Sequence, residues 1–268
     1  MVIALPMSGC ALVPAYDAGR SVYEVVRSLV AIWPDPKAIF VVDDGSRDNT
    51  AVEAERAGAR VIRHAHNRGK GAALRTGLWA AYDAGFETAV TVDADGQHAA
   101  ADALSLLHNP APKNALLLGI RDLVKAGAPR PNQISNRISN FFLSTFARTH
   151  FSDTQCGLRR YPIAATLAAD GGANGYAFEA EIILRLLASK TPVVEAPIHV
   201  IYPPEKERVT HFHSVRDPAR IIVRVVGTLV ETRYMTRPPH PVFVPTRPAP
   251  KREGKVSEPV IQQVQSSS

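Results

Sequence analysis

The stretch TAVTVDADGQH at residues 88–98 decides the fold, because a β-branched, apolar run ends there in two carboxylates. Such runs are typical of buried parallel strands, and ligands of open α/β sheets bind just beyond the carboxyl ends of those strands. Alternate side chains of a strand share a face, so we expect Asp93 and Asp95 to converge on one cation or sugar, followed by Gln97. Carboxylate and amide oxygens suit Mg²⁺ or Mn²⁺ that carries phosphate oxygens. Taken alone, this triplet is more often a solvated turn.

A second apolar run, AIFVVDDGSRDNT at residues 38–50, also ends in carboxylates, Asp43 and Asp44. Two strands of one sheet would then present acidic side chains at the same edge. We expect Asp43 or Asp44 to accept hydrogen bonds from a nucleobase or ribose, while Gly45 lets the backbone turn closely. The simpler expectation is a turn in which Asp48 or Asn49 caps the next helix, and capping would account for Asp48 fully. The pair of acidic strand ends favours a ligand site over two unrelated turns.

Strand and helix patterns alternate along the chain, which indicates right-handed crossovers and a mainly parallel sheet. A capping box of Ser21 and Glu24 is expected to start the first helix. The expected strands span about 10–16, 60–65, 115–121 and 193–202, in addition to the two acidic ones. The expected helices span about 49–57, 70–84, 101–108 and 132–148, and a further one opens near Phe178.

Five motifs in a fixed order resemble glycosyltransferase family 2, which has the GT-A fold, and in particular its polyprenyl-phosphate branch of the dolichol-phosphate-mannose type. The resemblance covers roughly residues 10–230 and rests on VPAYDAG at 13–19, VVDDGSRDNT at 41–50, NRGKGAALRTG at 67–77, DADGQH at 93–98 and DTQCGLRRY at 153–161. It implies an α/β, Rossmann-like sheet flanked by helices. It also implies a metal-dependent, inverting transferase that uses a UDP- or GDP-linked sugar and Mg²⁺ or Mn²⁺.

The resemblance assigns donor-side roles to particular residues. It implies that Asp93 lies near the sugar nucleotide, that Asp95 and Gln97 bind the metal, and that the base and ribose are held by Pro14, Tyr16 and Asp43. The family usually has Asn-Glu after the tyrosine, where this chain has Asp17-Ala18, so Asp17 is the carboxylate left to help hold the nucleoside.

Basic residues are expected near the donor. The segment around Lys70 lacks the G-x-x-x-x-G-K-[ST] spacing of a P-loop, so we expect a tight helix start and positive potential near the donor. In relatives a loop at the position of residues 202–217 folds over the diphosphate, which makes Arg208 a candidate together with Lys206 and His211. For His98, a helix-entry role is favoured over metal ligation.

The acceptor side contains candidates for both phosphate binding and base catalysis. The resemblance implies that Arg121 and Arg137 lie near an acceptor phosphate, and that Asp153 with Arg159 or Arg160 belongs to an acceptor-side segment. A polyprenyl phosphate is already anionic near neutral pH, since its second pKa is about 6, and needs no general base. A hydroxyl acceptor of a saccharide or lipid would need one, for which Asp153 or Glu179 is the candidate.

Two other classes of protein are alternatives to a glycosyltransferase for these motifs. Ala18, in place of the usual glutamate, suggests a catalytically idle module that binds nucleotide sugars. A nucleotidyltransferase would need a glycine-rich, arginine-containing loop after the first strand, which VPAYDAGRS does not supply. A working transferase is therefore preferred.

Composition agrees with one enzyme domain and a tail. A chain of 268 residues with 46% hydrophobic content can bury a full core. We expect a GT-A domain at 1–235, with a nucleotide-sugar half at about 8–122 and an acceptor half at about 123–235. Residues 236–268 are rich in proline, serine and basic residues and are expected to be disordered.

Charge and cysteine usage exclude several other classes. Half of the net charge of +6 belongs to the tail, so the surplus on the domain is mild, and no nucleic-acid partner is expected. Cys10 and Cys156 lack C-x-x-C spacing and are expected to be buried thiols.

The sequence predicts peripheral rather than membrane-spanning contact with a membrane. No window reaches the roughly 18 apolar residues of a membrane span, and the N-terminus lacks secretory features. The sequence thus predicts a cytoplasmic protein that can lie on the cytoplasmic face of the membrane. The segment 218–235 is apolar with interspersed arginines, so it fits a membrane surface, or equally packing on the domain or on a second subunit.

Overall fold

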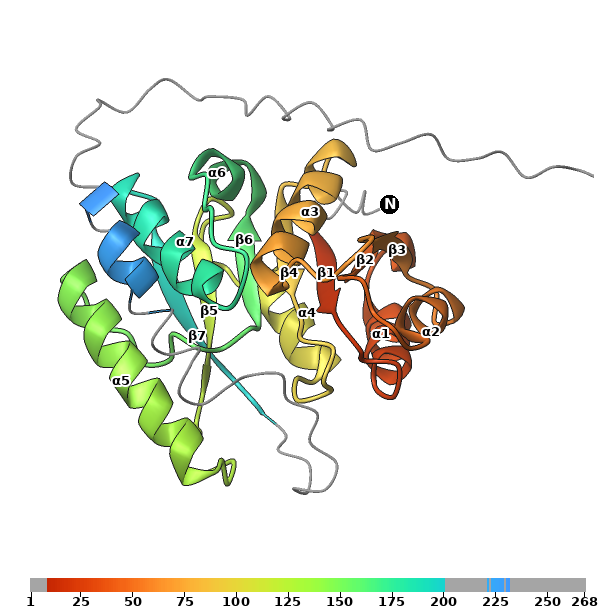
Figure 1. The fold of residues 1–268 in the computed structure, drawn as a ribbon, viewed down its shortest axis with the longest axis horizontal. Helices are drawn as coiled ribbons and strands as arrows, with labels where there is room; N and C mark the ends of the chain where they lie inside the picture. The colour runs from red at the N-terminus through yellow and green to blue at the C-terminus, as the bar shows by residue number, and fades with distance from the viewer. Residues whose placement is uncertain (1–8, 201–220, 222, 229, 232–268) are drawn as a thin grey trace, which may run out of the picture.

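One seven-stranded sheet runs through the molecule in the computed structural model, which describes residues 9–200, 221, 223–228 and 230–231 (Figure 1). The strands are β1 (Gly9–Ala15), β2 (Ile39–Asp43), β3 (Arg60–Arg63), β4 (Thr88–Thr91), β5 (Leu116–Arg121), β6 (Arg159–Pro162) and β7 (Val193–Ile198). The helices are α1 (Val22–Ile32), α2 (Thr50–Arg56), α3 (Lys70–Asp83), α4 (Ala100–His108), α5 (Arg130–Ala147), α6 (Ile163–Ala168) and α7 (Ala177–Ala188), with a 3₁₀ turn η1 (Pro36–Ala38).

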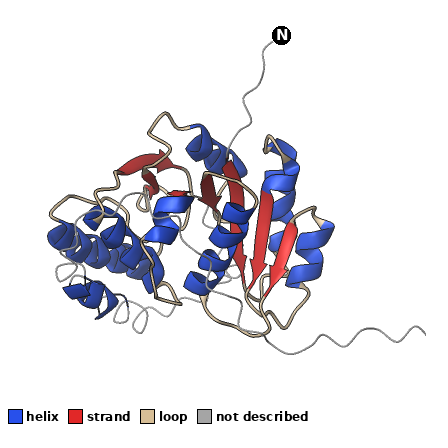
Figure 2. Ribbon diagram, turned by 90° about the horizontal axis from the view of Figure 1, so that it is seen from above, coloured by secondary structure: helices blue, strands red, loops and turns tan. Residues whose placement is uncertain are grey.

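The strand order β3-β2-β1-β4-β6-β5-β7 is parallel except at β6, which is antiparallel to both β4 and β5. Helix α3 packs on β1 and β2 and also contacts α6 and α7, while α1 contacts α2 and α4. Helices therefore lie on both faces of the sheet (Figure 2). This is the mixed α/β, mainly parallel architecture expected from the sequence.

The parallel strands bring the acidic strand ends to one edge. Asp43 is the last residue of β2 and pairs with Ala15, the last residue of β1. Strand β4 runs beside β1, and Val92 donates from its backbone amide to Leu12 at 3.0 Å before the chain reaches Asp93. The three loops that follow β1, β2 and β4 consequently open at the same edge of the sheet.

Two sequence-based expectations about local structure are wrong. Ser21 does not form a capping box, because its hydroxyl donates to the Ala94 carbonyl at 2.6 Å and makes no side-chain cap bond. This bond ties the start of α1 to the loop after β4. The last strand ends at Ile198 rather than near residue 202, and β6 and α6 were not expected at all. Strand β6 begins with two arginines, a composition that does not suggest a buried strand.

The core and the thiols agree with expectation. Cys10 and Cys156 are fully buried and unpaired, and burial raises the pKa of each to about 12.

Within the described part of the chain, no helix is long and apolar enough to cross a membrane. Between 221 and 231 the described residues are helical, and Ile221 and Val225 are buried against the domain. The predicted tail at 236–268 lies outside the described residues.

Candidate active site

The carboxylates at the end of β2 are buried and mostly satisfied by the protein itself. Asp44 accepts hydrogen bonds from His64 Nδ1 at 2.6 Å and from the backbone amides of Arg68 at 3.0 Å and Gly69 at 2.6 Å. Asp43 accepts from the Ser46 amide at 2.9 Å through Oδ1. Its Oδ2 lies 3.1 Å from Arg63 Nε in an ion pair and accepts no aligned hydrogen bond from the described residues.

The loop after β1 is tied to the loop after β2. The Asp17 amide donates to Ser46 Oγ at 2.9 Å, and Asp17 Oδ1 accepts from the Arg47 amide at 2.8 Å. Asp17 adopts φ +46°, a conformation that its short polar side chain tolerates. Pro14 is buried in β1 and Tyr16 is half-buried just beyond it. Four of the predicted nucleoside contacts, those at 14, 16, 17 and 43, are thereby gathered around one pair of loops.

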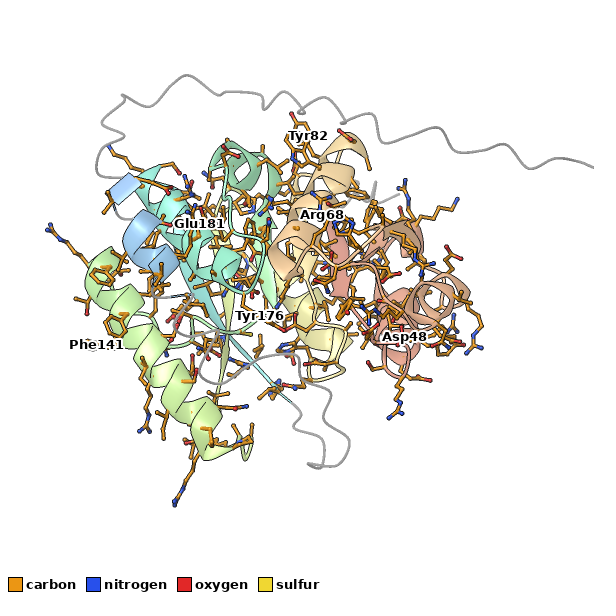
Figure 3. All side chains as sticks on the ribbon, in the orientation of Figure 1. Asp48, Arg68, Tyr82, Phe141, Tyr176 and Glu181 are labelled. Atoms are coloured by element: carbon orange, nitrogen blue, oxygen red, sulfur yellow. The ribbon has the colours of Figure 1, made fainter. Side chains whose placement is uncertain are left out.

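An ion cluster forms at the end of β4. Lys70 Nζ lies 2.7 Å from Asp93 Oδ1 and 3.2 Å from Glu179 Oε2, and it stands 5.7 Å from the centre of the Tyr176 ring. Figure 3 shows Tyr176 near the middle of the molecule, between the two ends of the sheet. Burial opposes the charge of Lys70, but the two carboxylates raise its pKa above the usual value. Lys70 is therefore a partly buried, permanently charged partner of Asp93.

The two acids of the DADGQH motif differ in charge behaviour. Burial alone would raise the pKa of Asp93, but Lys70 outweighs it and lowers that pKa. Burial and the neighbouring Asp93 carboxylate raise the pKa of Asp95 to about 6. His98 Nε2 is 4.0 Å from Asp93 Oδ2, and burial lowers the pKa of this imidazole to about 4. His98 is neutral near pH 7 and does not help to neutralise the two acids.

A divalent cation shared with a diphosphate fits this donor set. Asp95 is half-buried, its Oδ1 accepts only from the Gln97 amide at 3.0 Å among the described groups, and the charge of Asp93 disfavours its ionised form. Among the described residues, no group of three His, Cys, Asp or Glu side chains could hold a metal alone. Mg²⁺ is usually bound through one or two carboxylates plus substrate phosphates, so Asp95 and Gln97 suffice if the donor supplies the rest.

Glycine 157 was not identified from the sequence, although it lies inside the DTQCGLRRY motif. A Cβ atom at this position would collide with the carboxylate of Asp93. Only glycine therefore leaves Asp93 in its place beside Lys70. Sequence alone gives no signal for this contact, because the two residues are 64 positions apart (157 minus 93) and meet only through the pairing of β4 with β6.

At the end of β5, Arg121 and Asp153 form a buried pair. The guanidinium donates to Asp153 through Nε at 2.7 Å and Nη2 at 3.0 Å, and the Arg121 amide donates to the same carboxylate at 3.2 Å. Asp153 is fully buried. Both candidates leave the same sheet edge as the β4 cluster, and Arg121 contributes to lowering the pKa of Asp93.

The other acceptor-side candidates are placed differently. Arg159 and Arg160 are buried and donate to backbone carbonyls, Arg159 to Cys156 at 2.7 Å and Arg160 to Asn109 at 2.9 Å. We expected one of these two arginines to contribute a polar group to the acceptor side of the site. In the structure, both guanidinium groups instead hold backbone carbonyls inside the protein. Arg137 is exposed on α5, and its role stays a prediction. Arg208, Lys206 and His211 lie outside the described residues.

Comparison with known proteins identifies the family. The family described as "Glycosyl transferase family 2" matches residues 10–165. An uncharacterized protein, MJ1222 of Methanocaldococcus jannaschii, is 32% identical over 71% of this chain and 80% of its own length. The UDP-N-acetylglucosamine–dolichyl-phosphate N-acetylglucosaminyltransferase of Methanococcus voltae is 29% identical over 71% of this chain and 84% of its own.

Similarity to a solved structure confirms the fold. Glucosyl-3-phosphoglycerate synthase from Mycobacterium tuberculosis, crystallised with Mn²⁺, UDP and phosphoglyceric acid, superposes with a TM-score of 0.64 at 17% identity. The superposition covers 84% of this chain and 78% of that one. The chain belongs to glycosyl transferase family 2, and it is a glycosyltransferase similar to the polyprenyl-phosphate branch of that family.

Proposed function

We propose that this glycosyltransferase moves a sugar from a UDP- or GDP-linked donor to a polyprenyl phosphate, with Mg²⁺ or Mn²⁺ as cofactor. The name of the M. voltae relative, which pairs a UDP-sugar with dolichyl phosphate, supports both substrate classes. The Mn²⁺ and UDP bound to the structural neighbour support the cofactor. The proposal also places the protein in the cytoplasm, peripherally at the membrane that holds its acceptor.

The observation that carries the choice of acceptor is the pairing of both candidate bases with cations. Asp153 is held by Arg121, and Glu179 by Lys70. Both Asp153 oxygens and Glu179 Oε2 are already engaged by these cations, and Glu179 Oε1 is buried, so neither carboxylate presents a free oxygen to a substrate hydroxyl. A hydroxyl acceptor needs a base, whereas a phosphate monoester is ionised before it binds, with a second pKa of about 6. The arrangement therefore favours a phosphate acceptor.

The proposed reaction is a single displacement with inversion. An oxygen of the acceptor phosphate forms a bond to the anomeric carbon of the sugar. The bond from that carbon to the diphosphate oxygen breaks, and its electron pair leaves with the nucleoside diphosphate. Bound by Asp95 and Gln97, the divalent cation would neutralise the charge that develops on this leaving group.

Residues of the chain bind and orient the two substrates in this proposal. Asp93, held by Lys70, faces the sugar, and Arg121 attracts the acceptor phosphate to the same edge of the sheet. The nucleoside is held by Pro14, Tyr16, Asp17 and Asp43, and Arg137 and Arg208 are the remaining candidates for contacts with phosphate groups. Catalysis then depends on charge placed before the substrates arrive.

Mass spectrometry of the products tests the proposal. The purified chain is mixed with Mn²⁺ or Mg²⁺, a short-chain polyprenyl phosphate and a pool of UDP- and GDP-sugars. A glycosyl phosphopolyprenol is the expected product and names the donor. If donor is consumed only when a saccharide or lipid hydroxyl replaces the phosphate, the acceptor assignment is wrong. Nucleotide binding without turnover would identify an idle binding module instead.

A further inference from the structure

Helix α5 exposes apolar side chains along its outer face. Asn136, Ser139 and Leu143 are buried on its inner face. On the outer face, Ile134, Ile138 and Phe141 are exposed, and Phe141 retains 67% of its accessible surface. Figure 3 shows Phe141 at the outer edge of α5, directed away from the body of the molecule. A contiguous exposed patch of large apolar residues indicates a surface that contacts something other than water.

Arginines lie on the same face. At 100° per residue, Arg130 and Arg137 lie along one side of the exposed apolar stripe on the outer half of the helix, and both are exposed, as is the C-cap residue Arg148. The sequence of α5, RPNQISNRISNFFLSTFA, contains no aspartate or glutamate. The outer face of α5 is therefore both apolar and positively charged.

A second apolar face adjoins the first. The C-terminal helical segment, meaning the described residues 221, 223–228 and 230–231, buries Ile221 and Val225 and exposes Val223, Val226 and Val230. A shallow apolar depression is lined by residues of both elements, among them Ile138 and Phe142 of α5. Figure 1 shows this segment, in blue, at the same end of the molecule as α5.

We propose that the outer faces of α5 and of the C-terminal helical segment form a docking surface for an anionic phospholipid membrane. Apolar side chains would enter the boundary between head groups and acyl chains, while the arginines bind lipid phosphates. The charge favours this occupant over the chain's own tail, because residues 236–268 carry five basic and two acidic side chains and would be repelled.

The inner face of α5 links this surface to the site. Asn140 Nδ2 donates to the Ser152 carbonyl at 2.6 Å, and the Thr154 amide donates to Asn140 Oδ1 at 2.8 Å. Asp153, between these two residues, holds Arg121. A membrane bound to the outer face would thus lie one helix away from the residue proposed to attract the acceptor phosphate. The identity of that acceptor rests on the proposed function, whereas docking itself does not.

Flotation of the full chain with vesicles tests the docking surface. We expect binding to vesicles of phosphatidylcholine and phosphatidylglycerol in a 7:3 ratio, and at least about tenfold weaker binding to phosphatidylcholine alone or in high salt. Phe141→Ser and Val226→Ser should each weaken binding to the anionic vesicles about tenfold, a factor that corresponds to about 1.4 kcal/mol. Val52→Ser is the matched control, since Val52 is 60% exposed on α2, and it should bind as the parent chain does.

Several outcomes would overturn the docking surface. Equal binding of Phe141→Ser and the parent chain would do so, as would equal binding to neutral and anionic vesicles. A parent chain that is dimeric in solution, becomes monomeric on Phe141→Ser and binds no vesicles would show that a second copy covers this face.

Activity separates this proposal from the proposed function. With a short-chain polyprenyl phosphate in water and no vesicles, Phe141→Ser should transfer sugar as fast as the parent chain. Vesicle binding without any transfer would leave the docking surface standing and reject the acceptor assignment.

Discussion

Two aspartates lie at or just beyond the end of each of the strands β2 and β4, but the aspartates have different surroundings at the two strand ends. At β2, Asp44 is buried and accepts three hydrogen bonds, two of them from backbone amides of the loop before α3. At β4, Asp93 keeps 25% of its side chain exposed and depends on Lys70, while Asp95 has one local amide partner. Satisfied carboxylates stabilise a fold, whereas carboxylates that repel each other at a sheet edge are ready to bind a cation. Stability and chemistry are thus assigned to the two strands that flank β1.

The largest effect is expected from Asp95→Ala. Loss of the cation ligand should lower kcat/KM by about 10³-fold or more, because stabilisation of the leaving group is lost. The free energy of unfolding should change by less than about 1 kcal/mol, since the side chain is half-buried with a single local bond. Initial rates with Mn²⁺ and urea denaturation check both values. Glu55→Ala, exposed on α2, is the control, and full activity of Asp95→Ala would reject the metal assignment.

Asp44→Ala should show the opposite behaviour. Two backbone amides and the His64 ring would lose a buried acceptor, which should lower the free energy of unfolding by about 3 kcal/mol. Asp44→Asn keeps one acceptor oxygen and should lose less. Urea denaturation of both variants measures the difference. An unchanged midpoint for Asp44→Ala would show that the two strand ends do not differ as described.

Gly157→Ala tests how tightly Asp93 is placed. The new methyl group should push the Asp93 carboxylate away from Lys70. A displacement of about 1 Å is expected to lower kcat about 10²-fold. Steady-state kinetics at saturating donor measure it. Gly227→Ala serves for comparison, because a Cβ there meets open space, and it should keep full activity. Similar rates for the two variants would mean that Asp93 need not be held in this position.

Glu181 extends the comparison to the acceptor side, and its effect should be the smallest. Burial alone would raise its pKa, but hydrogen bonds from Arg224 and from the amides of Ala173 and Gly172 lower it to about 2. A depressed pKa contributes stability that is present above the unfolded-state value of about 4.3 and is lost as pH falls through about 2.

The parent chain should therefore lose about 1–2 kcal/mol more than Glu181→Gln between pH 5 and pH 2. Thermal or urea denaturation across this range measures the loss. Parallel stability curves for the two proteins would show that the Glu181 bonds add nothing to the pH dependence.

Most of the fold could be predicted from local sequence, because buried strands and amphipathic helices have distinct periods. Six of the seven strands were expected, and the exception was β6, where Arg159 and Arg160 mask the pattern. Those arginines are buried because backbone carbonyls of distant loops accept their hydrogen bonds, a condition that no local window contains. The same reason explains why the bond from Ser21 to Ala94 replaced the expected capping box.

The sequence by itself determined the family, the two acidic strand ends and the candidates Asp93, Asp95, Arg121 and Lys70, since these depend on residue types at short spacings. Tertiary structure alone decided which charges meet. It brought Lys70 of α3 beside Glu179 of α7 and Arg121 beside Asp153. It also placed the Asp93 carboxylate where a side chain at position 157 would collide with it. Such contacts join residues far apart in the chain, and their strength depends on burial, which is a property of the folded protein and not of any segment.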